Sequence, residues 1–238
     1  MASLYSAVSS RQFQSGRGFL EKLELKPGDK VIDMGCGTGE LTKYIAEQVG
    51  DIGEVIGVDP DSARIEFSKE NTKPVCNVRF HEGDSKSGFP YQDEAHYDLH
   101  FSNYVYHWLR DEEKVNYVNL ASRCLKPGGL IAIQCLAASG EATIDSMSRS
   151  ANVSVVDSQA TRELLHDCGF TDINIMTIPK TFYFNSFEDF GGFFLATTHK
   201  KIEELGDKLW LEEFKMKSIQ KDGRAKFEMK ILQIQGRK

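Results

Sequence analysis

Three glycines at every second position form the segment of this chain most suited to binding a ligand. Gly35, Gly37 and Gly39 follow the apolar run at 31–34, and a helix-like pattern comes after them. Glycine has no Cβ atom, so the backbone can adopt left-handed dihedral angles and a ligand can touch it directly. A turn of this kind between a strand and a helix holds nucleotide-like ligands in α/β sheets.

The spacing of the glycines and the carboxylate of Asp33 separate two classes of ligand. A dinucleotide site uses G-x-G-x-x-G, with the helix N-terminus facing a pyrophosphate. Here the spacing is G-x-G-x-G, and Asp33 precedes it. A carboxylate repels a diphosphate in a partly dry cleft and attracts a cation. The turn therefore favours a cationic ligand and argues against a nicotinamide dehydrogenase.

The block D-M-G-C-G-T-G-E at 33–40 resembles the first motif of class I S-adenosylmethionine (SAM) methyltransferases, which is roughly E/D-x-G-x-G-x-G. SAM carries a sulfonium and an ammonium group but no phosphate, which agrees with an acidic neighbour. The string L-K-P-G-G-L-I-A-I at 125–133 is a further match to this family. The resemblance spans about residues 30–135 and implies that SAM is the cofactor.

A second acidic residue stands at the expected distance for a nucleoside site. A predicted strand at 54–59 ends in Asp59, 24 positions after Gly35. The spacing to a ribose-binding acid is about 20 residues in related turns. A carboxylate can accept hydrogen bonds from both ribose hydroxyls. Asp61 is the better candidate for the N-cap of the helix that follows, which leaves Asp59 for the ligand.

The resemblance implies further cofactor-binding residues at the ends of other predicted strands. Pro60 would lie near the adenine, and Asp84 would accept from the adenine amino group. Ser85 could supply a backbone N–H, and Asn103 ends the strand predicted at 97–103. A simple turn aspartate is the alternative for Asp84.

Two short segments bear on the substrate. The sequence S-N-Y-V-Y-H-W at 102–108 resembles the N-x-x-x-H/Q-W segment of trans-aconitate and juvenile hormone acid methyltransferases. Tyr5 followed by Gln12 resembles the N-terminal segment of the juvenile hormone enzymes. The resemblance implies that Gln12 and Trp108, both neutral donors, hold a substrate carboxylate, with Tyr5 and His107 as further substrate-binding residues. Core packing remains open for Trp108, as does a structural hydrogen bond for His107.

The chemistry of the acceptor decides whether a base is needed. A carboxylate has a pKa near 4, so it is already ionised at pH 7 and needs none. An amine or phenol must lose a proton, and His107 is then the candidate catalytic residue. We expect a SAM-dependent methyltransferase that methylates a carboxylate oxygen of a small molecule. The alternatives are transfer to a small amine or imidazole with His107 as base, and a non-catalytic SAM-binding regulatory protein.

The elements that must position these residues alternate between strand and helix. Such alternation predicts an α/β fold: a Rossmann-like, seven-stranded, mostly parallel sheet with right-handed crossovers. The resemblance adds that the last strand is antiparallel. We expect the site outside the carboxyl ends of the strands. The predicted strands lie at 31–34, 54–59, 77–82, 97–103, 130–135, 172–178 with a possible extension at 181–184, and 225–235.

The 238 residues are expected to form one methyltransferase domain. Its predicted parts are a helical cover at 1–25, a SAM-binding core at 26–178, a helical insertion over the cleft at 186–221 and the last strand at 225–235. The polar segment at 137–154 is predicted to be mobile over the cleft. The aromatic cluster containing Phe193 and Phe194 is assigned to the core rather than to the substrate site.

Composition limits the other possibilities. Five irregularly spaced cysteines, with no C-x-x-C or Cys/His cluster, predict no disulfide framework, no metal site and a reduced cytoplasmic protein. No secretory signal or membrane-spanning run is found. The net charge is −6, and lysines at 200–221 alternate with glutamates, which argues against nucleic acid. We expect a small-molecule substrate, no nucleic acid or membrane partner, and a monomer or homodimer.

Overall fold

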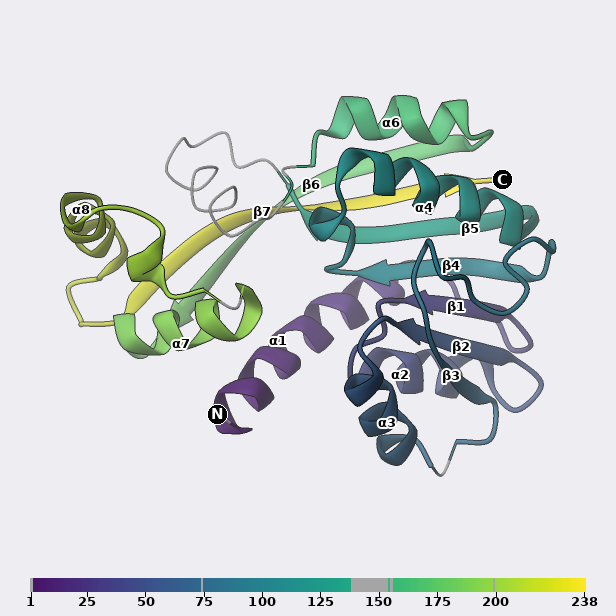
Figure 1. The fold of residues 1–238 in the computed structure, drawn as a ribbon, viewed down its shortest axis with the longest axis horizontal. Helices are drawn as coiled ribbons and strands as arrows, with labels where there is room; N and C mark the ends of the chain where they lie inside the picture. Colours follow the sequence, from purple (N-terminus) through teal and green to yellow (C-terminus); the bar gives the residue numbers. More distant parts are fainter. Residues whose placement is uncertain (1, 74, 138–153, 155, 199) are drawn as a thin grey trace.

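A single seven-stranded sheet runs through the computed structural model of this protein (Figure 1). The structure describes residues 2–73, 75–137, 154, 156–198 and 200–238, with the backbone alone for residues 2–10. The strand order is β3-β2-β1-β4-β5-β7-β6. The strands are β1 (Lys30–Met34), β2 (Glu54–Asp59), β3 (Val78–Glu82), β4 (Tyr97–Asn103), β5 (Leu125–Leu136), β6 (Thr171–Phe184) and β7 (Ala225–Arg237).

The pairing of the strands confirms the predicted fold class. Strands β1 to β5 pair in parallel, whereas β7 runs antiparallel to both β5 and β6. The order of the strands reverses between β1 and β4. Strands β2 and β3 lie on one side of β1, whereas β4 and β5 lie on its other side. A reversal of this kind opens a crevice at the carboxyl ends of the strands, where ligands bind.

Helices cover both faces of the sheet. They are α1 (Ala2–Leu20), α2 (Glu40–Val49), α3 (Ser62–Asn71), α4 (Asp111–Cys124), α6 (Ser158–Asp167), α7 (Phe187–Thr198) and α8 (Lys208–Ser218), with 3-10 turns η1 (Tyr106–Trp108) and η2 (Ile202–Glu204). Successive strand residues point to opposite faces. Val31 thus packs with residues of α1 and α2, whereas Ile32 packs with residues of α4 and α6.

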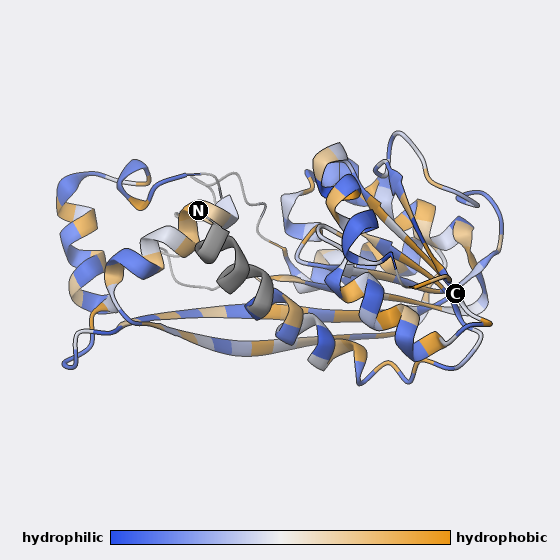
Figure 2. Cartoon of the chain, turned by 90° about the horizontal axis from the view of Figure 1, so that it is seen from below, coloured by the Kyte–Doolittle hydropathy of each residue, from blue (hydrophilic) through white to orange (hydrophobic). Residues whose placement is uncertain are grey.

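Strands β6 and β7 extend past the rest of the sheet and carry α7, η2 and α8 at their far end (Figures 1 and 2). The segments predicted at 172–178 and 181–184 are one continuous strand. A separate aromatic core that includes Phe184, Phe190 and Phe214 holds these helices on the two strands. Residues 186–221, predicted as a helical insertion, contain α7, η2 and α8, and α1 contacts α7. Of the segment predicted to be mobile, residues 138–153 lie outside the described residues.

Two local features bear on the predictions. Asp61 caps α3, since its Oδ1 accepts from the backbone N–H groups of Ala63 and Arg64. Strand β5 begins at Leu125 rather than at residue 130, because Leu125 already pairs with Tyr97 before the register shifts at the Pro-Gly-Gly sequence.

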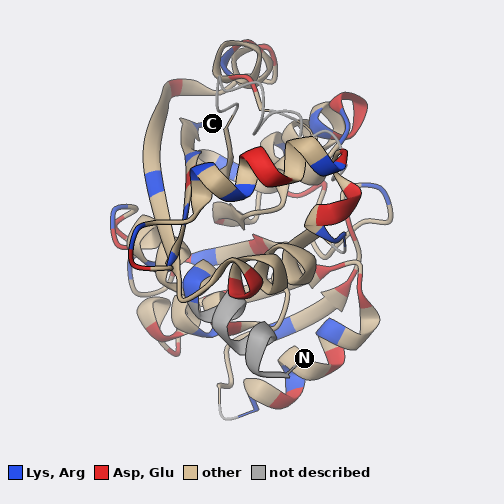
Figure 3. Cartoon of the chain, turned by 90° about the vertical axis from the view of Figure 1, so that its left-hand side faces the viewer, with Lys and Arg blue, Asp and Glu red and all other residues tan. Residues whose placement is uncertain are grey.

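The distribution of charge along the fold agrees with the pattern of the sequence. In the ribbon of Figure 3, positions of Lys and Arg are interspersed with positions of Asp and Glu. Across the described ranges, no helix combines the length and the apolar character needed to cross a bilayer. The cytoplasmic location, the absence of a nucleic-acid partner and the oligomeric state stay predictions.

Candidate active site

A cavity of about 560 Å³ lies at the carboxyl ends of β1 to β4, with α1, β6 and α7 contributing to its walls. Nearly all the residues predicted to bind ligands meet there. Gly39 does not line the cavity, and Tyr5 lies in the part of α1 for which only the backbone is described. The predicted residues that line it are Gln12, Asp33, Gly35, Gly37, Asp59, Pro60, Asp84, Ser85, Asn103, His107 and Trp108.

The three glycines of the turn serve different purposes. Gly35 has a φ of 81°, and a Cβ atom there would stand 2.1 Å from Cγ2 of Val105. Gly37 has a φ of 56°, and nothing lies within 4 Å of its Cβ position. Its backbone is therefore bare toward the cavity. At Gly39 a Cβ would meet side-chain atoms of Ser68 and Phe80 at 2.9 and 3.0 Å. Gly39 is needed for packing α2 against α3 and β3.

Asp59 is buried at the end of β2 and is fixed by two backbone donors. Its Oδ2 accepts from the N–H of Gly37 at 3.0 Å, and its Oδ1 accepts from the N–H of Asp61 at 3.0 Å. Each carboxylate oxygen can accept a second hydrogen bond. The carboxylate is thus oriented by the glycine turn and can still receive a ligand hydroxyl on each oxygen.

Asp33 is a second buried carboxyl group in the same cavity. Burial raises its pKa to about 7, and the charge of Asp59 adds to this, while the hydroxyl of Thr42, which donates to Oδ2 at 2.7 Å, acts in the opposite direction. A positively charged ligand nearby would favour the ionised form. The residues on this wall therefore suit a cation and disfavour a diphosphate.

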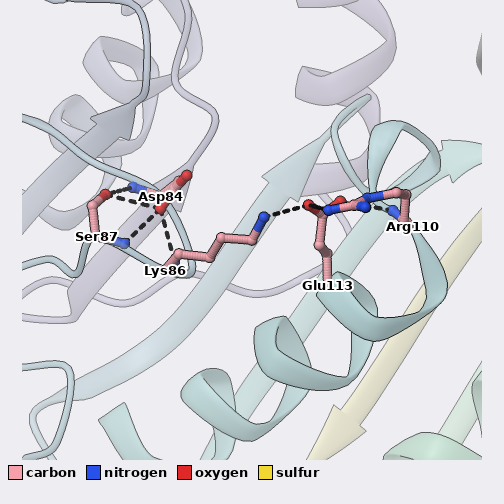
Figure 4. A network of polar contacts seen from close by, with 5 residues as sticks. All are labelled: Asp84, Lys86, Ser87, Arg110 and Glu113. Carbon is pink, nitrogen blue, oxygen red and sulfur yellow. Dashed lines mark hydrogen bonds and ion pairs between the residues drawn. The ribbon is translucent and has the colours of Figure 1, made fainter.

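A polar network joins the loop after β3 to the start of α4 (Figure 4). Oδ1 of Asp84 accepts from the backbone N–H groups of Lys86 and Ser87 and from the Ser87 hydroxyl. Burial raises the pKa of Asp84, but these hydrogen bonds outweigh it and leave the pKa below its ordinary value. Nζ of Lys86 contacts Glu113 at 2.5 Å, and Arg110 contacts the same carboxylate at 2.9 Å. Arg110 and Lys86 hold the pKa of Glu113 well below its usual range.

This network shows that Asp84 is a turn aspartate through Oδ1 while it also lines the cavity. The two roles that the sequence offered for Asp84, a turn aspartate and a cofactor-binding residue, are therefore compatible with each other.

A chain of side-chain hydrogen bonds attaches α1 to the ends of the strands. Nδ2 of Asn103 donates to the carbonyl of Gln12 at 3.3 Å, and Oδ1 of Asn103 accepts from Gln134 at 2.8 Å. Gln134 also donates to the hydroxyl of Ser15. Asn103 thus fixes the helix that carries Gln12. The complete series of hydrogen bonds links Lys22, Gln233, Gln134, Asn103 and Gln12 in that order.

The turn η1 presents two aromatic side chains to the cavity. His107 is buried, and its Nδ1 accepts from the backbone N–H of Leu136 at 3.3 Å. Burial lowers the pKa of His107 to about 3, and the charge of Lys114 adds to this. A neutral imidazole that accepts at Nδ1 carries its proton on Nε2. Trp108 is 38% exposed and lines the cavity, so it does not pack in the core.

The sequence motifs gave no indication of one wall of the cavity. Arg11, Phe182 and Phe193 line it from α1, β6 and α7. Phe194 is buried in the aromatic core, as assigned from sequence, and Phe193 packs against the same core while it also lines the cavity. These residues come from segments far apart in the chain and follow no motif, so only the helical insertion as a whole could be anticipated.

The comparisons with known proteins agree with this geometry. A family model described as "Methyltransferase domain" matches residues 25–169. Phosphoethanolamine N-methyltransferase 1 of Arabidopsis thaliana is 31% identical over 170 residues, which is 70% of this chain and 33% of that protein. Trans-aconitate 2-methyltransferase of Deinococcus radiodurans is 32% identical over 112 residues, which is 46% of this chain and 38% of that protein. The chain therefore spans little more than a third of these relatives.

A solved structure shares the fold over most of the chain. Phosphoethanolamine N-methyltransferase 2 of Haemonchus contortus in complex with SAM superposes with a TM-score of 0.65 at 17% identity, covering 94% of this chain and 52% of that one. The family model alone covers more than half of the sequence. The chain thus belongs to the methyltransferase domain family, which confirms the resemblance to class I SAM-dependent methyltransferases that its glycine turn suggested.

Proposed function

We propose that this protein transfers a methyl group from SAM to a carboxylate oxygen of a small molecule. The observation that carries the choice of acceptor is the hydrogen bond from Leu136 to Nδ1 of His107. That bond occupies the only nitrogen of the neutral ring that could accept a proton, and burial lowers the pKa to about 3. His107 is therefore a poor general base and a good N–H donor. Such a site suits a nucleophile that is already ionised.

The residues that would hold the cofactor fit its chemistry. When bound, SAM supplies an electrophilic methyl group on a positively charged sulfur. The bare backbone at Gly37 leaves room for a ligand, and the carboxylate of Asp59 has acceptor capacity for ribose hydroxyls. Asp33 can become negatively charged beside a cation, and the described residue that hydrogen-bonds its carboxyl group is the neutral Thr42. Pro60, Asp84 and Ser85 line the same cavity.

The acceptor would be positioned by neutral donors. Gln12, Trp108 and Nε2 of His107 lie around the cavity and could each donate to a carboxylate oxygen without neutralising it. The protein would then contribute orientation and the exclusion of water. Correct orientation alone can account for a large part of a rate enhancement. No proton transfer is required in the methyl-transfer step.

Transfer to a nitrogen is the second candidate. It is supported by the relative named phosphoethanolamine N-methyltransferase, which matches 70% of this chain. An amine acceptor would need to reach the site unprotonated, because His107 is poorly suited to take up its proton.

A screen with methyl-labelled SAM tests the proposal. The purified protein is incubated with a set of carboxylic acids, amines and phenols, and the labelled product is then treated with mild alkali. We expect transfer to acids, with a methyl ester that releases its label as methanol in alkali. Label that stays in an alkali-stable amine product would contradict the carboxylate acceptor and favour the nitrogen one.

A further inference from the structure

Arg11 reaches the cavity from α1 and lies against the wall formed by β6 and α7. Its guanidinium carbon is 4.4 Å from the ring centroid of Phe184, and 5.9 and 5.8 Å from those of Phe182 and Phe193. Nη2 donates to the backbone carbonyl of Tyr183 at 3.1 Å. Stacking on aromatic faces and this hydrogen bond fix the plane of the guanidinium group.

One end of this fixed guanidinium group has no partner. Nη1 of Arg11 is buried, and among the described residues nothing accepts a hydrogen bond from it. Native structures rarely leave a buried donor unsatisfied, and an unsatisfied charged donor is the most costly kind. The side chain that carries this donor lines the cavity, where an anionic ligand could supply the missing acceptor.

The other cations that line the cavity are already paired. Arg64 lies 3.5 Å from the carboxylate of Asp61, and Lys86 contacts Glu113 at 2.5 Å. Arg11 is the one lysine or arginine among the described lining residues with no recorded carboxylate contact. Among the described residues, no carboxylate is paired with the guanidinium group on this wall.

We propose that Arg11 binds an anionic group of the acceptor, a carboxylate or a phosphate, at a point separate from the atom that is methylated. This rests on the proposed function, in which His107 and Trp108 position the group that receives the methyl. Those two residues belong to η1, whereas the ring contacts and the side-chain hydrogen bond of Arg11 with described residues are to β6 and α7.

The chemistry of the group agrees with that role. A guanidinium group presents parallel N–H donors that match carboxylate and phosphate oxygens. The phenylalanine rings around it exclude water and so strengthen an ion pair. The acceptor would then carry two functional groups: one that receives the methyl group and one anion that orients it.

Calorimetric titration of the complex with S-adenosylhomocysteine tests this assignment. The probes are inorganic phosphate and glutarate, with glutaramide as the uncharged match for glutarate, in a buffer of low chloride concentration. The variants are Arg11→Met, which keeps the apolar stem, and Arg11→Lys, which keeps the charge without the planar fork. Arg17→Met is the matched control, because Arg17 lies on the same helix, is paired with Glu21 and does not line the cavity.

We expect the wild type to bind at least one of the two anions, and glutarate more tightly than glutaramide if it is the one bound. Arg11→Met should weaken anion binding about 10- to 100-fold, the range for hydrogen bonds to charged groups. Arg11→Lys should lie between, and Arg17→Met should match the wild type. Unchanged affinity of Arg11→Met for S-adenosylhomocysteine would show that its fold is intact.

Three results would overturn the assignment. The first is that the wild type and Arg11→Met bind the anion with equal affinity. The second is that the wild type binds neither anion. The last is that Arg11→Met loses as much affinity for S-adenosylhomocysteine as it loses for the anion. The last would mean that Arg11 holds the carboxylate of the cofactor. If the wild type did not bind S-adenosylhomocysteine at all, the proposed function would be refuted instead. In that case, anion binding by the free protein that is lost in Arg11→Met would still support the anion site.

Discussion

The backbone N–H of Leu136 lies 3.3 Å from Nδ1 of His107 and donates to it. Leu136 is the last residue of β5, and His107 belongs to the short turn η1 after β4. The contact joins two neighbouring strand ends and fixes which ring nitrogen bears the proton. The contact thus leaves Nε2 as the N–H donor of a histidine that the sequence offered as either base or binding residue.

The first prediction concerns His107. Replacement by asparagine should keep activity toward a carboxylic acid within about tenfold at neutral pH, because only one hydrogen bond to substrate changes. With SAM at saturation, so that the titration of Asp33 does not affect the rate, the wild type should show no ionisation near pH 6.5, since the pKa of His107 is lowered to about 3. Steady-state rates across the pH range measure both. Complete loss of turnover in His107→Asn with normal S-adenosylhomocysteine affinity would indicate a general base.

The second prediction compares two neighbouring aspartates. Asp59→Ala should weaken S-adenosylhomocysteine binding by about 1.5–3 kcal/mol, since charged hydrogen bonds to the ligand are lost. Asp61→Ala removes the N-cap of α3 and should cost about 1 kcal/mol of folding stability with little effect on affinity. Calorimetry and thermal unfolding separate the two effects. Equal affinity losses in both variants would place Asp59 outside the ligand site.

The third prediction follows from the pKa of Asp33, which burial raises to about 7. The ionised carboxylate attracts a cationic cofactor more strongly than the neutral acid does. The affinity for SAM should therefore increase as the pH rises through about 7, and this increase should be absent in Asp33→Asn. Dissociation constants measured on both sides of that pH provide the check. Parallel pH dependences in the two proteins would show that another group titrates.

The fourth prediction concerns the same carboxyl group and folding. Its pKa of about 7 in the folded protein exceeds the ordinary value of 3.8, so between these two pH values the folded protein holds a proton that the unfolded chain releases. Folding stability is therefore lost as the pH rises from 3.8 toward 7, and the loss is complete above 7. Asp33→Asn should raise the melting temperature at alkaline pH, with no gain in acid. A gain of equal size at every pH would refute this linkage.

The fifth prediction uses two glycines of α1. A Cβ atom at Gly16 would stand 2.5 Å from Leu41 and 2.9 Å from Nδ2 of Asn103, whereas Gly18 has nothing within 4 Å. Gly18→Ala should stabilise the helix by about 0.5–1 kcal/mol. Gly16→Ala should instead displace α1 from Asn103 and raise the KM for the acceptor. If both alanine variants stabilised the protein and left KM unchanged, α1 would not position the substrate.

Several parts of the site could be predicted from the sequence because their geometry is local. The glycine turn, Asp59 and the N-cap at Asp61 depend on residues close together in the chain, and the strands that precede them are strongly apolar. Parallel strands bring their carboxyl ends to one edge, so residues placed after each strand were expected to meet. The common cavity lined by Asp33, Asp59 and Asn103 agrees with that expectation.

The sequence by itself therefore determined the fold class and the family, and it pointed to residues that the structure gathers around one cavity. The tertiary structure alone decided the protonation of His107 and the surroundings of Arg11. The first depends on a backbone donor at Leu136, and the second on aromatic rings from β6 and α7, more than 170 residues along the chain. Neither relation leaves a periodic pattern, because burial and hydrogen-bond partners are set by packing between distant segments rather than by local spacing.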